Sequence, residues 1–353
     1  MRSKIAFSSA SRNVPWAALL LFWMLVPAAL AEPVTLRVQH FLGTDSLPHR
    51  ALIEPWARRV EGDSAGRLRI EIHPAMTLGG TAPELIDQVQ QGTVDIVWTA
   101  AAYTPGRFPR SEVFALPLVH TGNPVATNLA IMQLIQRELA PDFVGLKPLL
   151  IHVDQGHAFH LSNRSVARVA QFGGLTLRPP GKGIGSWTIT ALGAENTKKR
   201  HPKLPKAMRQ GELDGALMTF TLAESMGVTE ASQSHTLLDQ KEFFGTSLFL
   251  FVMNDARFRA LPADLRTVIE RNSGPEFARE IGDIYQQAGD AAITAAERRG
   301  NRINLLQGAE LEQARSRLAT VVARWRDERT ALSIDGAALI AAARSAIASH
   351  SGE

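Results

Sequence analysis

The chain has 353 residues, of which 45% are hydrophobic and 20% charged, a composition typical of a soluble protein and a length too great for one small core. Its formal net charge of +4 falls to +1 when Arg2, Lys4 and Arg12 are set aside with the rest of an apparent leader, and a nearly neutral protein has no overall field to bind a polyanion. Nucleic acid is therefore excluded as a partner, and the lack of cysteine excludes a disulfide-stabilised scaffold.

Residues 1–31 have the pattern of an export signal. Basic residues precede an apolar run over residues 14–30, and a small-x-small pattern ends at Ala31. A retained membrane anchor is the alternative, but Pro15 and Pro27 interrupt the run, which is shorter than the roughly 20 residues that span a bilayer. We therefore expect cleavage after Ala31 and a soluble protein in the periplasm.

The next part of the chain alternates predicted strands with predicted helices. Alternating apolar residues predict strands at 34–38, 68–72 and 94–98, and helical periods follow Pro48 and Pro83. Strands and helices at this spacing predict a mostly parallel sheet that is covered on both faces.

The middle of the chain repeats this pattern. Strands are predicted near 149–153, 175–178 and 214–219, with helices near 184–192 and 204–210. The repetition predicts a second α/β lobe.

Two long helical periods follow in the last part of the chain. Apolar residues recur on one stripe from 275 to 300 and again from 311 to 325. Such stripes are typical of helices that pack against a neighbouring lobe.

Arg178 is the first candidate for a functional residue. Leu175 and Leu177 share one face of a predicted strand, whereas Arg178 lies on the other face at its carboxyl end, where ligands bind in open α/β sheets. Pro179 and Pro180 stiffen the turn that follows. A rigidly mounted guanidinium suits bidentate binding of a carboxylate, and a surface ion pair is the alternative interpretation.

Other binding motifs are absent or incomplete. The glycines between Gly181 and Ser186 match neither phosphate-binding template and are interpreted as a flexible entry into a helix. His152, His157 and His160 lie close in sequence, but the last two project to opposite faces of an extended segment, so no metal site is predicted.

No pattern indicates catalysis. The chain has no cysteine nucleophile, no G-x-S-x-G turn and no H-E-x-x-H helix, so neither an enzyme nor a cofactor is predicted. A basic run indicates a solvated surface, or alternatively a docking surface for an acidic partner: Lys198, Lys199, Arg200, Lys203, Lys206 and Arg209.

Several stretches in one order resemble the substrate-binding proteins of TRAP transporters, the DctP-like group. They are SAGRLRIEIHPAMTLGG (64–80), QQGTVDI (90–96), FALPLV (114–119), FGGLTLRPPG (172–181), LGA (192–194) and KAMRQGELDGA (206–216). The resemblance covers most of the chain after the leader and implies an α/β fold of two lobes with a ligand cleft between them. It assigns residues 32–155 and about 244–283 to lobe I, and residues 156–243 and about 284–353, including a helix that spans both lobes, to lobe II.

The resemblance also implies ligand-binding residues. Arg178 falls on the arginine that anchors the ligand carboxylate in this family. Phe159, or Ala158 beside it, stands where many relatives carry a second arginine, Met218 replaces a polar amide, and His201 replaces an aromatic residue. Fewer polar partners and two apolar ones favour an apolar body behind a single carboxylate, hence an aromatic or branched monocarboxylate.

Three further residues are candidates for the first lobe's side of the cleft. Trp98 ends the third predicted strand and Tyr103 lies beyond it, and each lines either the cleft or the core. Glu84 aligns with an acidic position that some relatives use toward the ligand, but it also lies in a helix's first turn, where a carboxylate is favoured anyway.

The implied function is capture without chemistry. The lobes close over a small organic carboxylate, and the closed form, a monomer, delivers it to a TRAP-type membrane permease. The alternatives are a receptor for an ABC permease, a periplasmic enzyme of similar fold, and the soluble ligand subunit of a sensor.

Overall fold

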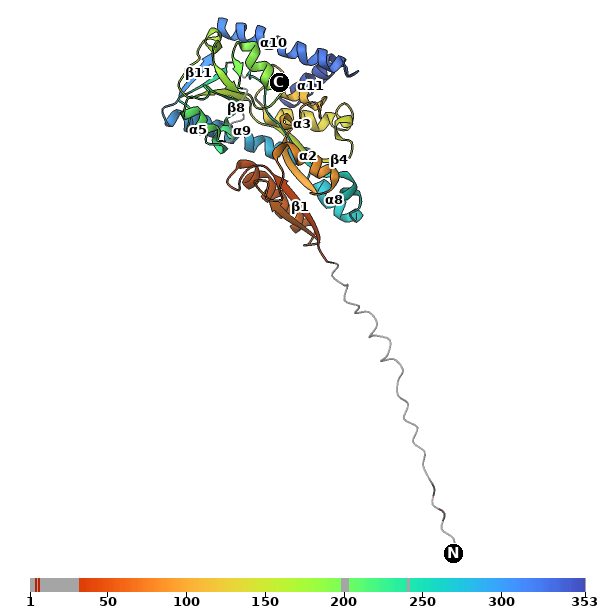
Figure 1. Cartoon of the computed structure of the whole chain (residues 1–353). Helices are drawn as coiled ribbons and strands as arrows, with labels where there is room; N and C mark the ends of the chain where they lie inside the picture. Colours follow the sequence, from red (N-terminus) through yellow and green to blue (C-terminus); the bar gives the residue numbers. More distant parts are fainter. Residues whose placement is uncertain (1–3, 5, 7–31, 198–202, 240–241, 353) are drawn as a thin grey trace.

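The computed structural model shows two α/β lobes (Figure 1). It describes residues 4, 6, 32–197, 203–239 and 242–352. A five-stranded sheet forms lobe I and a six-stranded sheet forms lobe II, which confirms the predicted two-lobed α/β fold. The predicted export signal lies outside the described residues, apart from Lys4 and Ala6.

The sheet of lobe I has the strand order β2-β1-β3-β10-β4. Its strands are β1 (Val34–His40), β2 (Leu68–His73), β3 (Ile96–Ala100), β4 (Leu146–Val153) and β10 (Leu248–Asn254). β1 pairs in parallel with β2 and β3, whereas β10 runs antiparallel to β3 and β4. The sheet is therefore less parallel than expected, because β10 returns from lobe II beside the strand that leads there.

Helices cover both faces of this sheet. They are α1 (Glu54–Asp63), α2 (Leu85–Gln91), α3 (Pro124–Leu134), α7 (Asp255–Arg259) and α8 (Ala263–Arg271). A π-helical turn, η2 (Pro48–Ile53), runs into α1, which buries Trp56 and Val60 on the predicted stripe. The Asn123 side chain caps α3 by accepting a hydrogen bond from the Ala126 N–H at 3.0 Å.

Short 3₁₀ turns connect several elements of lobe I. They are η3 (Ala82–Glu84), η4 (Ala101–Tyr103), η5 (Ser111–Ala115) and η6 (Ala140–Phe143). Of these, η4 and η5 follow the carboxyl end of β3, so they extend from the sheet edge that faces lobe II.

The sheet of lobe II has the strand order β11-β9-β5-β8-β6-β7. Its strands are β5 (His157–Leu161), β6 (Thr176–Arg178), β7 (Glu195–Asn196), β8 (Gly215–Thr219), β9 (Ser234–Leu238) and β11 (Arg302–Leu306). Its helical elements are η7 (Val169–Phe172), α4 (Ile184–Leu192), α5 (Leu204–Arg209) and α6 (Phe220–Ser225). Here β5 is the reversed strand, antiparallel to both β8 and β9, because it enters from lobe I.

Two chain segments cross between the lobes side by side. The first joins β4 to β5 between Val153 and His157, and the second leads from β9 to β10. The Thr246 hydroxyl donates to the Asp154 carbonyl at 2.8 Å, and the His157 N–H donates to the Gly245 carbonyl at 2.8 Å. These bonds tie the crossings together, so the lobes are joined at one edge.

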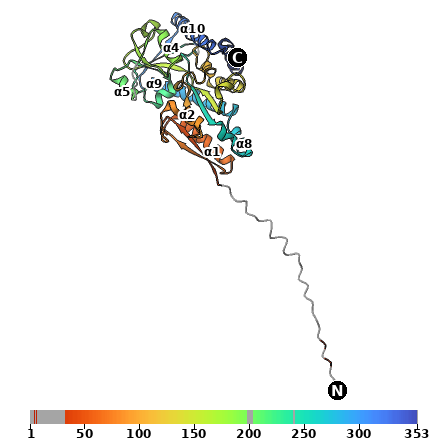
Figure 2. The same ribbon diagram turned by 45° about the vertical axis from the view of Figure 1, so that its right-hand side comes forward.

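Two long helices span both lobes (Figure 1, Figure 2). In α9 (Pro275–Arg298), Phe277 and Ile281 belong to the core of lobe I, whereas Ala292 and Ala296 pack against lobe II. Gly282 lets α9 approach α3, because a Cβ at that position would lie 2.6 Å from the Val125 Cα.

The second spanning helix is α10 (Ala309–Thr330). Leu311 and Leu318 pack into lobe II, and Trp325 packs into lobe I. The resemblance implied one spanning helix, so α10 adds a second connection.

The last helix, α11 (Gly336–His350), packs on lobe I. Leu339, Ile340 and Ile347 join the core cluster that contains Ala130 and Ile131 of α3. The resemblance assigned this segment to lobe II, but its apolar residues pack on α3 in lobe I instead. Apolar periodicity shows that a helix has a buried face, but it does not show which lobe covers that face.

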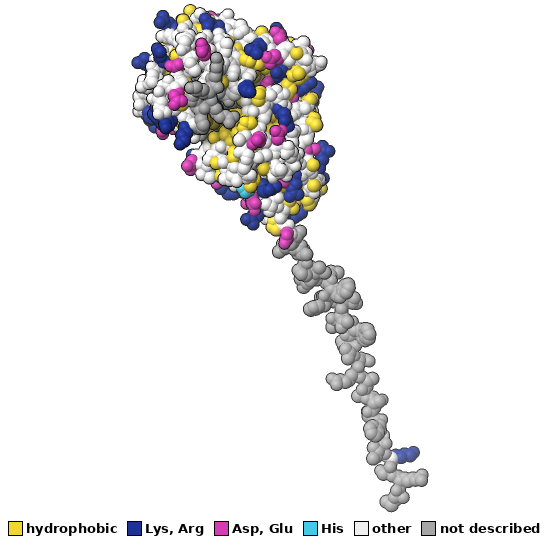
Figure 3. Space-filling view, viewed as in Figure 1, with side chains coloured by type: hydrophobic (Ala, Val, Ile, Leu, Met, Phe, Trp, Pro, Cys, Tyr) yellow, Lys and Arg dark blue, Asp and Glu magenta, His cyan; other side chains and the backbone are white. Residues whose placement is uncertain are grey.

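The face of the molecule in Figure 3 has no dominant charge. Basic and acidic side chains are interspersed over the face in Figure 3, as the small net charge predicts. Within the part of the chain that the structure describes, no helix combines the length and apolarity required to cross a bilayer.

Candidate functional site

Arg178 lies at the carboxyl end of β6, as predicted. β6 pairs in parallel with β8, and Leu177 beside it is fully buried in the core of lobe II, which fixes the strand end that carries Arg178. The Arg178 side chain is half-buried, and its Nη1 atom is buried without a hydrogen-bond partner among the described residues. A buried donor without a partner costs free energy unless an acceptor, such as an anion, pairs with it.

Tyr103 faces Arg178 from the other lobe. It ends the turn η4 beyond β3, and its ring packs edge-on against Phe41 with centroids 5.1 Å apart. Burial raises the pKa of the Tyr103 phenol, while the charge and hydrogen bonding of the neighbouring Arg178 guanidinium oppose the rise. The structure thus brings together two of the predicted residues, one from each lobe.

A cavity of about 50 Å³ lies between the lobes at this place. Its apolar wall includes Ala100, Ala101, Ala115, Ile184, Leu222 and Leu248. Its polar lining includes Tyr103, Glu112, His157, Lys182, Thr246 and Ser247. Residues from lobe I, lobe II and a crossing segment all contribute, so the shape of the cavity depends on how closely the lobes approach.

The lobes approach each other to backbone distance at one edge of this cavity. A Cβ atom on Gly181 would lie 2.5 Å from the carbonyl oxygen of Ala102, far inside van der Waals contact. Gly181 precedes α4 in lobe II, whereas Ala102 belongs to η4 in lobe I. The absence of a side chain at residue 181 therefore permits this close approach of the two lobes.

His157 lines the cavity but was not predicted as a ligand residue. Its Nε2 lies 3.0 Å from the Ser247 hydroxyl, and its Nδ1 is buried without a partner among the described atoms. Burial lowers the pKa of His157 to about 3, with the charges of His120 and Arg178 as smaller causes, so the ring is neutral at physiological pH.

The three histidines near the crossing do not converge. His152 accepts from the Trp98 indole N–H at 3.0 Å, His157 bonds Ser247, and His160 lies 2.8 Å from a nitrogen of His235. Within the described ranges, no three metal-ligating side chains come together.

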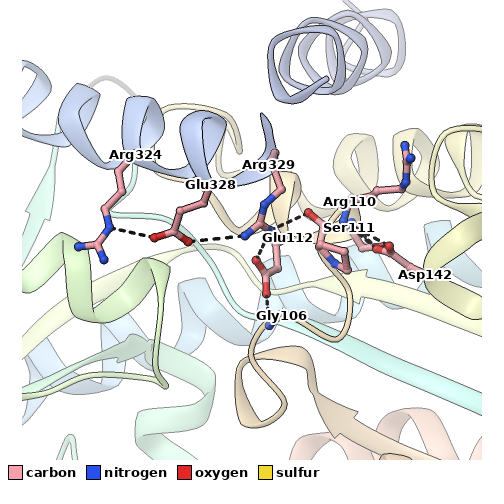
Figure 4. Close-up of polar contacts among 9 residues, drawn as sticks. Gly106, Arg110, Ser111, Glu112, Asp142, Arg324, Glu328 and Arg329 are labelled. Carbon is pink, nitrogen blue, oxygen red and sulfur yellow. Dashed lines mark hydrogen bonds and ion pairs between the residues drawn. The ribbon is translucent and has the colours of Figure 1, made fainter. Parts of the chain in front are cut away.

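Glu112 connects the cavity wall to the end of α10 (Figure 4). The buried Arg329 donates to Glu112 at 2.8 Å, and Glu112 also accepts from the Gly106 N–H at 3.1 Å. Arg329 continues to Glu328 at 3.7 Å and from there to Arg324 at 3.1 Å. The chain of charges fixes the loop of lobe I that carries η4 and η5.

Asp154, in the first crossing segment, is fully buried. It accepts hydrogen bonds from the Gln155 N–H at 2.8 Å and from the Thr221 hydroxyl. Burial nevertheless raises the pKa of Asp154 to about 6, because desolvation outweighs the hydrogen bonds from Thr219, Thr221 and Gln155.

Phe159 and Met218 lie in the core of lobe II. Phe159 is fully buried against Phe172 and Phe244, with ring centroids 4.6 and 4.8 Å away. Met218 is fully buried in a separate cluster that includes Met208. Neither side chain lines the cavity.

Trp98 and Glu84 also have structural partners. Trp98 is 1% exposed and stacks on Phe249 with centroids 4.8 Å apart, besides its bond to His152. Glu84 is exposed and accepts from the N–H of Thr81 at 2.7 Å, as a helix-capping carboxylate does. His201 lies outside the described residues.

Two of the larger hollows are open to solvent. One, of about 740 Å³, lies beside Arg299 and Asn301 in lobe II, and the other, of about 700 Å³, lies between residues 42–50 and α9. Arg299 donates to Glu224 at 2.9 Å, and the Asn301 amide donates to the Ser232 carbonyl at 2.9 Å. These polar groups are already paired, unlike the Nδ1 atom of His157 at the cavity between the lobes.

The sequence matches one protein family over most of its length. Residues 38–328 match the model described as bacterial extracellular solute-binding protein, family 7.

Two solved structures are similar to nearly the whole chain. One is a marine metagenome TRAP solute-binding protein specific for aromatic acid ligands, in complex with metahydroxyphenylacetate: TM-score 0.86, 30% identity, covering 90% of this chain and 99% of that one. The other is a TRAP solute-binding protein from Rhodoferax ferrireducens T118 in complex with copurified benzoate: TM-score 0.85, 32% identity, covering 90% and 99%.

A curated relative is longer than this chain. The uncharacterized protein y4mM of Sinorhizobium fredii is 26% identical over 305 residues, which are 84% of this chain. The chain spans 53% of that relative's length.

Proposed function

Because the chain belongs to the bacterial extracellular solute-binding proteins of family 7 and is a TRAP solute-binding protein, we propose that it binds a small aromatic monocarboxylate between its lobes. It delivers this acid to a TRAP-type membrane permease from the periplasm. No bond of the ligand is made or broken.

The unpaired Nη1 of Arg178 carries this proposal. The carboxylate of the ligand accepts hydrogen bonds from the Arg178 fork and from the adjacent Tyr103 hydroxyl, which satisfies the donor that the protein leaves buried. Exclusion of water by the closed lobes strengthens this ion pair, because the effective dielectric constant falls.

The walls of the cavity favour a compact apolar body. Ala101, Ala115 and Leu248 offer no hydrogen-bonding side chain, whereas a dicarboxylate or a sugar acid needs several polar partners. The aromatic acids in two similar solved structures support the same ligand class.

Phe159 and Met218 do not contact the ligand in this proposal. Both shape lobe II from its core, so the apolar surface that meets the ligand comes from the alanines and leucines of the cavity wall. Trp98 likewise supports the turn that carries Tyr103 by stacking on Phe41.

Calorimetry with a panel of acids tests the proposal. Benzoate and phenylacetate are expected to bind more tightly than succinate or malate, and Arg178→Ala is expected to weaken benzoate binding by about 3–5 kcal/mol because a buried carboxylate loses its partner. Arg164→Ala is the matched control, since Arg164 is exposed and is not among the residues that line the cavity. Tighter binding of malate than of any aromatic acid, or full benzoate affinity in Arg178→Ala, would contradict the proposal.

The same preparations separate a carrier from an enzyme. A bound acid that is recovered unchanged and is identified by mass spectrometry supports capture. A product of different mass would instead show turnover.

A further inference from the structure

His157 lines the cavity and carries a buried polar atom without a partner among the described residues, its Nδ1. The residue is 4% exposed. Two backbone features fix its position. His157 is the first residue of β5, and its N–H donates a hydrogen bond to the Gly245 carbonyl at 2.8 Å. A buried nitrogen left without a partner costs free energy, so a group that pairs with it favours binding.

The other ring nitrogen fixes the orientation of His157. Its Nε2 lies 3.0 Å from the Ser247 hydroxyl, and Ser247 itself belongs to the second crossing and lines the cavity. The imidazole therefore cannot rotate to satisfy Nδ1 without giving up the Ser247 bond. Because the ring is neutral, Nδ1 contributes one hydrogen bond, as donor or acceptor, and no charge.

A carboxylate does not need this third contact. Arg178 and Tyr103 already provide donors from both lobes, and the exposed Lys182 adds a charge at the edge of the cavity. A neutral hydrogen-bonding atom in the cavity wall instead selects for a polar substituent, since an analogue that lacks this substituent leaves the buried nitrogen unpaired.

We propose that His157 is a specificity residue whose Nδ1 hydrogen-bonds to a hydroxyl of the ligand, so that the preferred ligands are hydroxylated aromatic acids. This inference rests on the proposed capture of an aromatic monocarboxylate and defines the ligand class further. Ser247 is the positioning residue that orients the ring.

Two substitutions of His157 distinguish the contributions of its two ring nitrogens. The terminal amide of glutamine reaches the place of Nε2, so His157→Gln keeps the Ser247 bond and removes the Nδ1 contact. The shorter amide of asparagine reaches the place of Nδ1, so His157→Asn keeps the ligand contact and loses Ser247. His350→Gln and His350→Asn are the matched controls, because His350 is exposed, bonds Gln133, and is not among the residues that line the cavity.

The probes are benzoate, 3-hydroxybenzoate, 4-hydroxybenzoate and mandelate, measured by calorimetry. The wild type is expected to bind at least one hydroxylated acid roughly tenfold more tightly than benzoate. His157→Gln is expected to bring that ratio close to one while benzoate affinity stays nearly unchanged, and His157→Asn to retain a larger share of the ratio.

The inference would be overturned if the wild type bound benzoate as tightly as, or more tightly than, every hydroxylated acid. This measurement uses only the wild type, so it does not depend on the folding of a variant. An equal loss of affinity for benzoate and for hydroxylated acids in His157→Gln would also overturn it, since the contact would then be to the carboxylate or purely structural. If the wild type binds none of the four acids, or Arg178→Ala binds them normally, the proposed function itself fails.

Discussion

Two effects oppose each other in the ionisation of Asp154: its hydrogen bonds favour the charged carboxylate, and its burial disfavours it. Its hydrogen bonds from Gln155 and Thr221 fit an ionised carboxylate, and they tie the first crossing to lobe II. Its complete burial opposes ionisation, and burial dominates. The ionised form of Asp154 therefore lowers the stability of the folded protein, although its hydrogen bonds are kept.

Replacing Asp154 by asparagine is expected to stabilise the protein above pH 6. The pKa is raised from 3.8 to about 6 in the folded state, so folding favours the protonated form; the penalty is present above pH 6 and disappears as the pH falls toward 4. At 1.36 kcal/mol for each unit of pKa difference, Asp154→Asn gains at most about 3 kcal/mol at pH 8. Urea denaturation at pH 8 and pH 4 measures this, and an equal effect of Asp154→Asn at both values would contradict it.

At the scale of elements, two connections of lobe I and lobe II form the mouth of the cavity. The turn η4 carries Tyr103 and the Ala102 carbonyl, and the segment before α4 carries Gly181. The loop around η4 and η5 is fixed by Glu112 and the buried Arg329, so the contact at Gly181 meets a rigid surface. Closure of the lobes thus depends on one residue without a side chain.

Gly181→Ala is expected to weaken ligand binding without lowering the stability of the ligand-free protein. The added Cβ would lie 2.5 Å from the Ala102 carbonyl only in the closed arrangement, so it disfavours closure. We expect calorimetry to show a loss of about tenfold or more for benzoate, while the melting temperature without ligand changes little.

Gly62→Ala is the control, because a Cβ on Gly62, within α1, meets nothing within 4 Å. Unchanged benzoate affinity in Gly181→Ala would show that the backbone contact is not part of the ligand-bound state.

At the scale of the whole molecule, buried neutral histidines in both lobes make the stability of the fold dependent on pH. Burial lowers the pKa of His40, His120 and His235 to about 4 and that of His152 and His157 to about 3, and it also lowers the pKa of His160 well below its usual value. These rings stay neutral in the folded protein where the unfolded chain would protonate them.

Stability is therefore expected to fall as the pH decreases from about 6.5 toward 4. Each histidine is protonated near 6.5 in the unfolded chain but not in the folded one, and contributes a loss of up to about 1.4 kcal/mol per pH unit in this window. Asp154 acts in the opposite direction, but one carboxyl does not offset six imidazoles. Urea denaturation at pH 7.5, 6.5 and 5.5 measures the trend, and a constant free energy of unfolding over this range would contradict it.

The sequence by itself determined the elements and the class of fold. Apolar periods placed the helices 184–192 and 275–300 within two residues of α4 and α9, because side-chain burial on one face is a local property of the chain. The family stretches predicted a TRAP solute-binding protein, which the family match and two solved structures confirm. Arg178 was placed at the carboxyl end of its strand by alternation alone.

Only the tertiary structure decided which side chains meet. Tyr103 and Arg178 come from different lobes, His157 faces the cavity while Phe159 on the same strand is buried among aromatic rings, and α11 packs on lobe I. These outcomes depend on how the two sheets are oriented relative to each other across the crossing segments. Contacts between residues far apart in sequence produce no periodic pattern of apolar residues, so the sequence does not reveal them. A half-buried arginine with an unpaired nitrogen becomes visible only once its neighbours are in place.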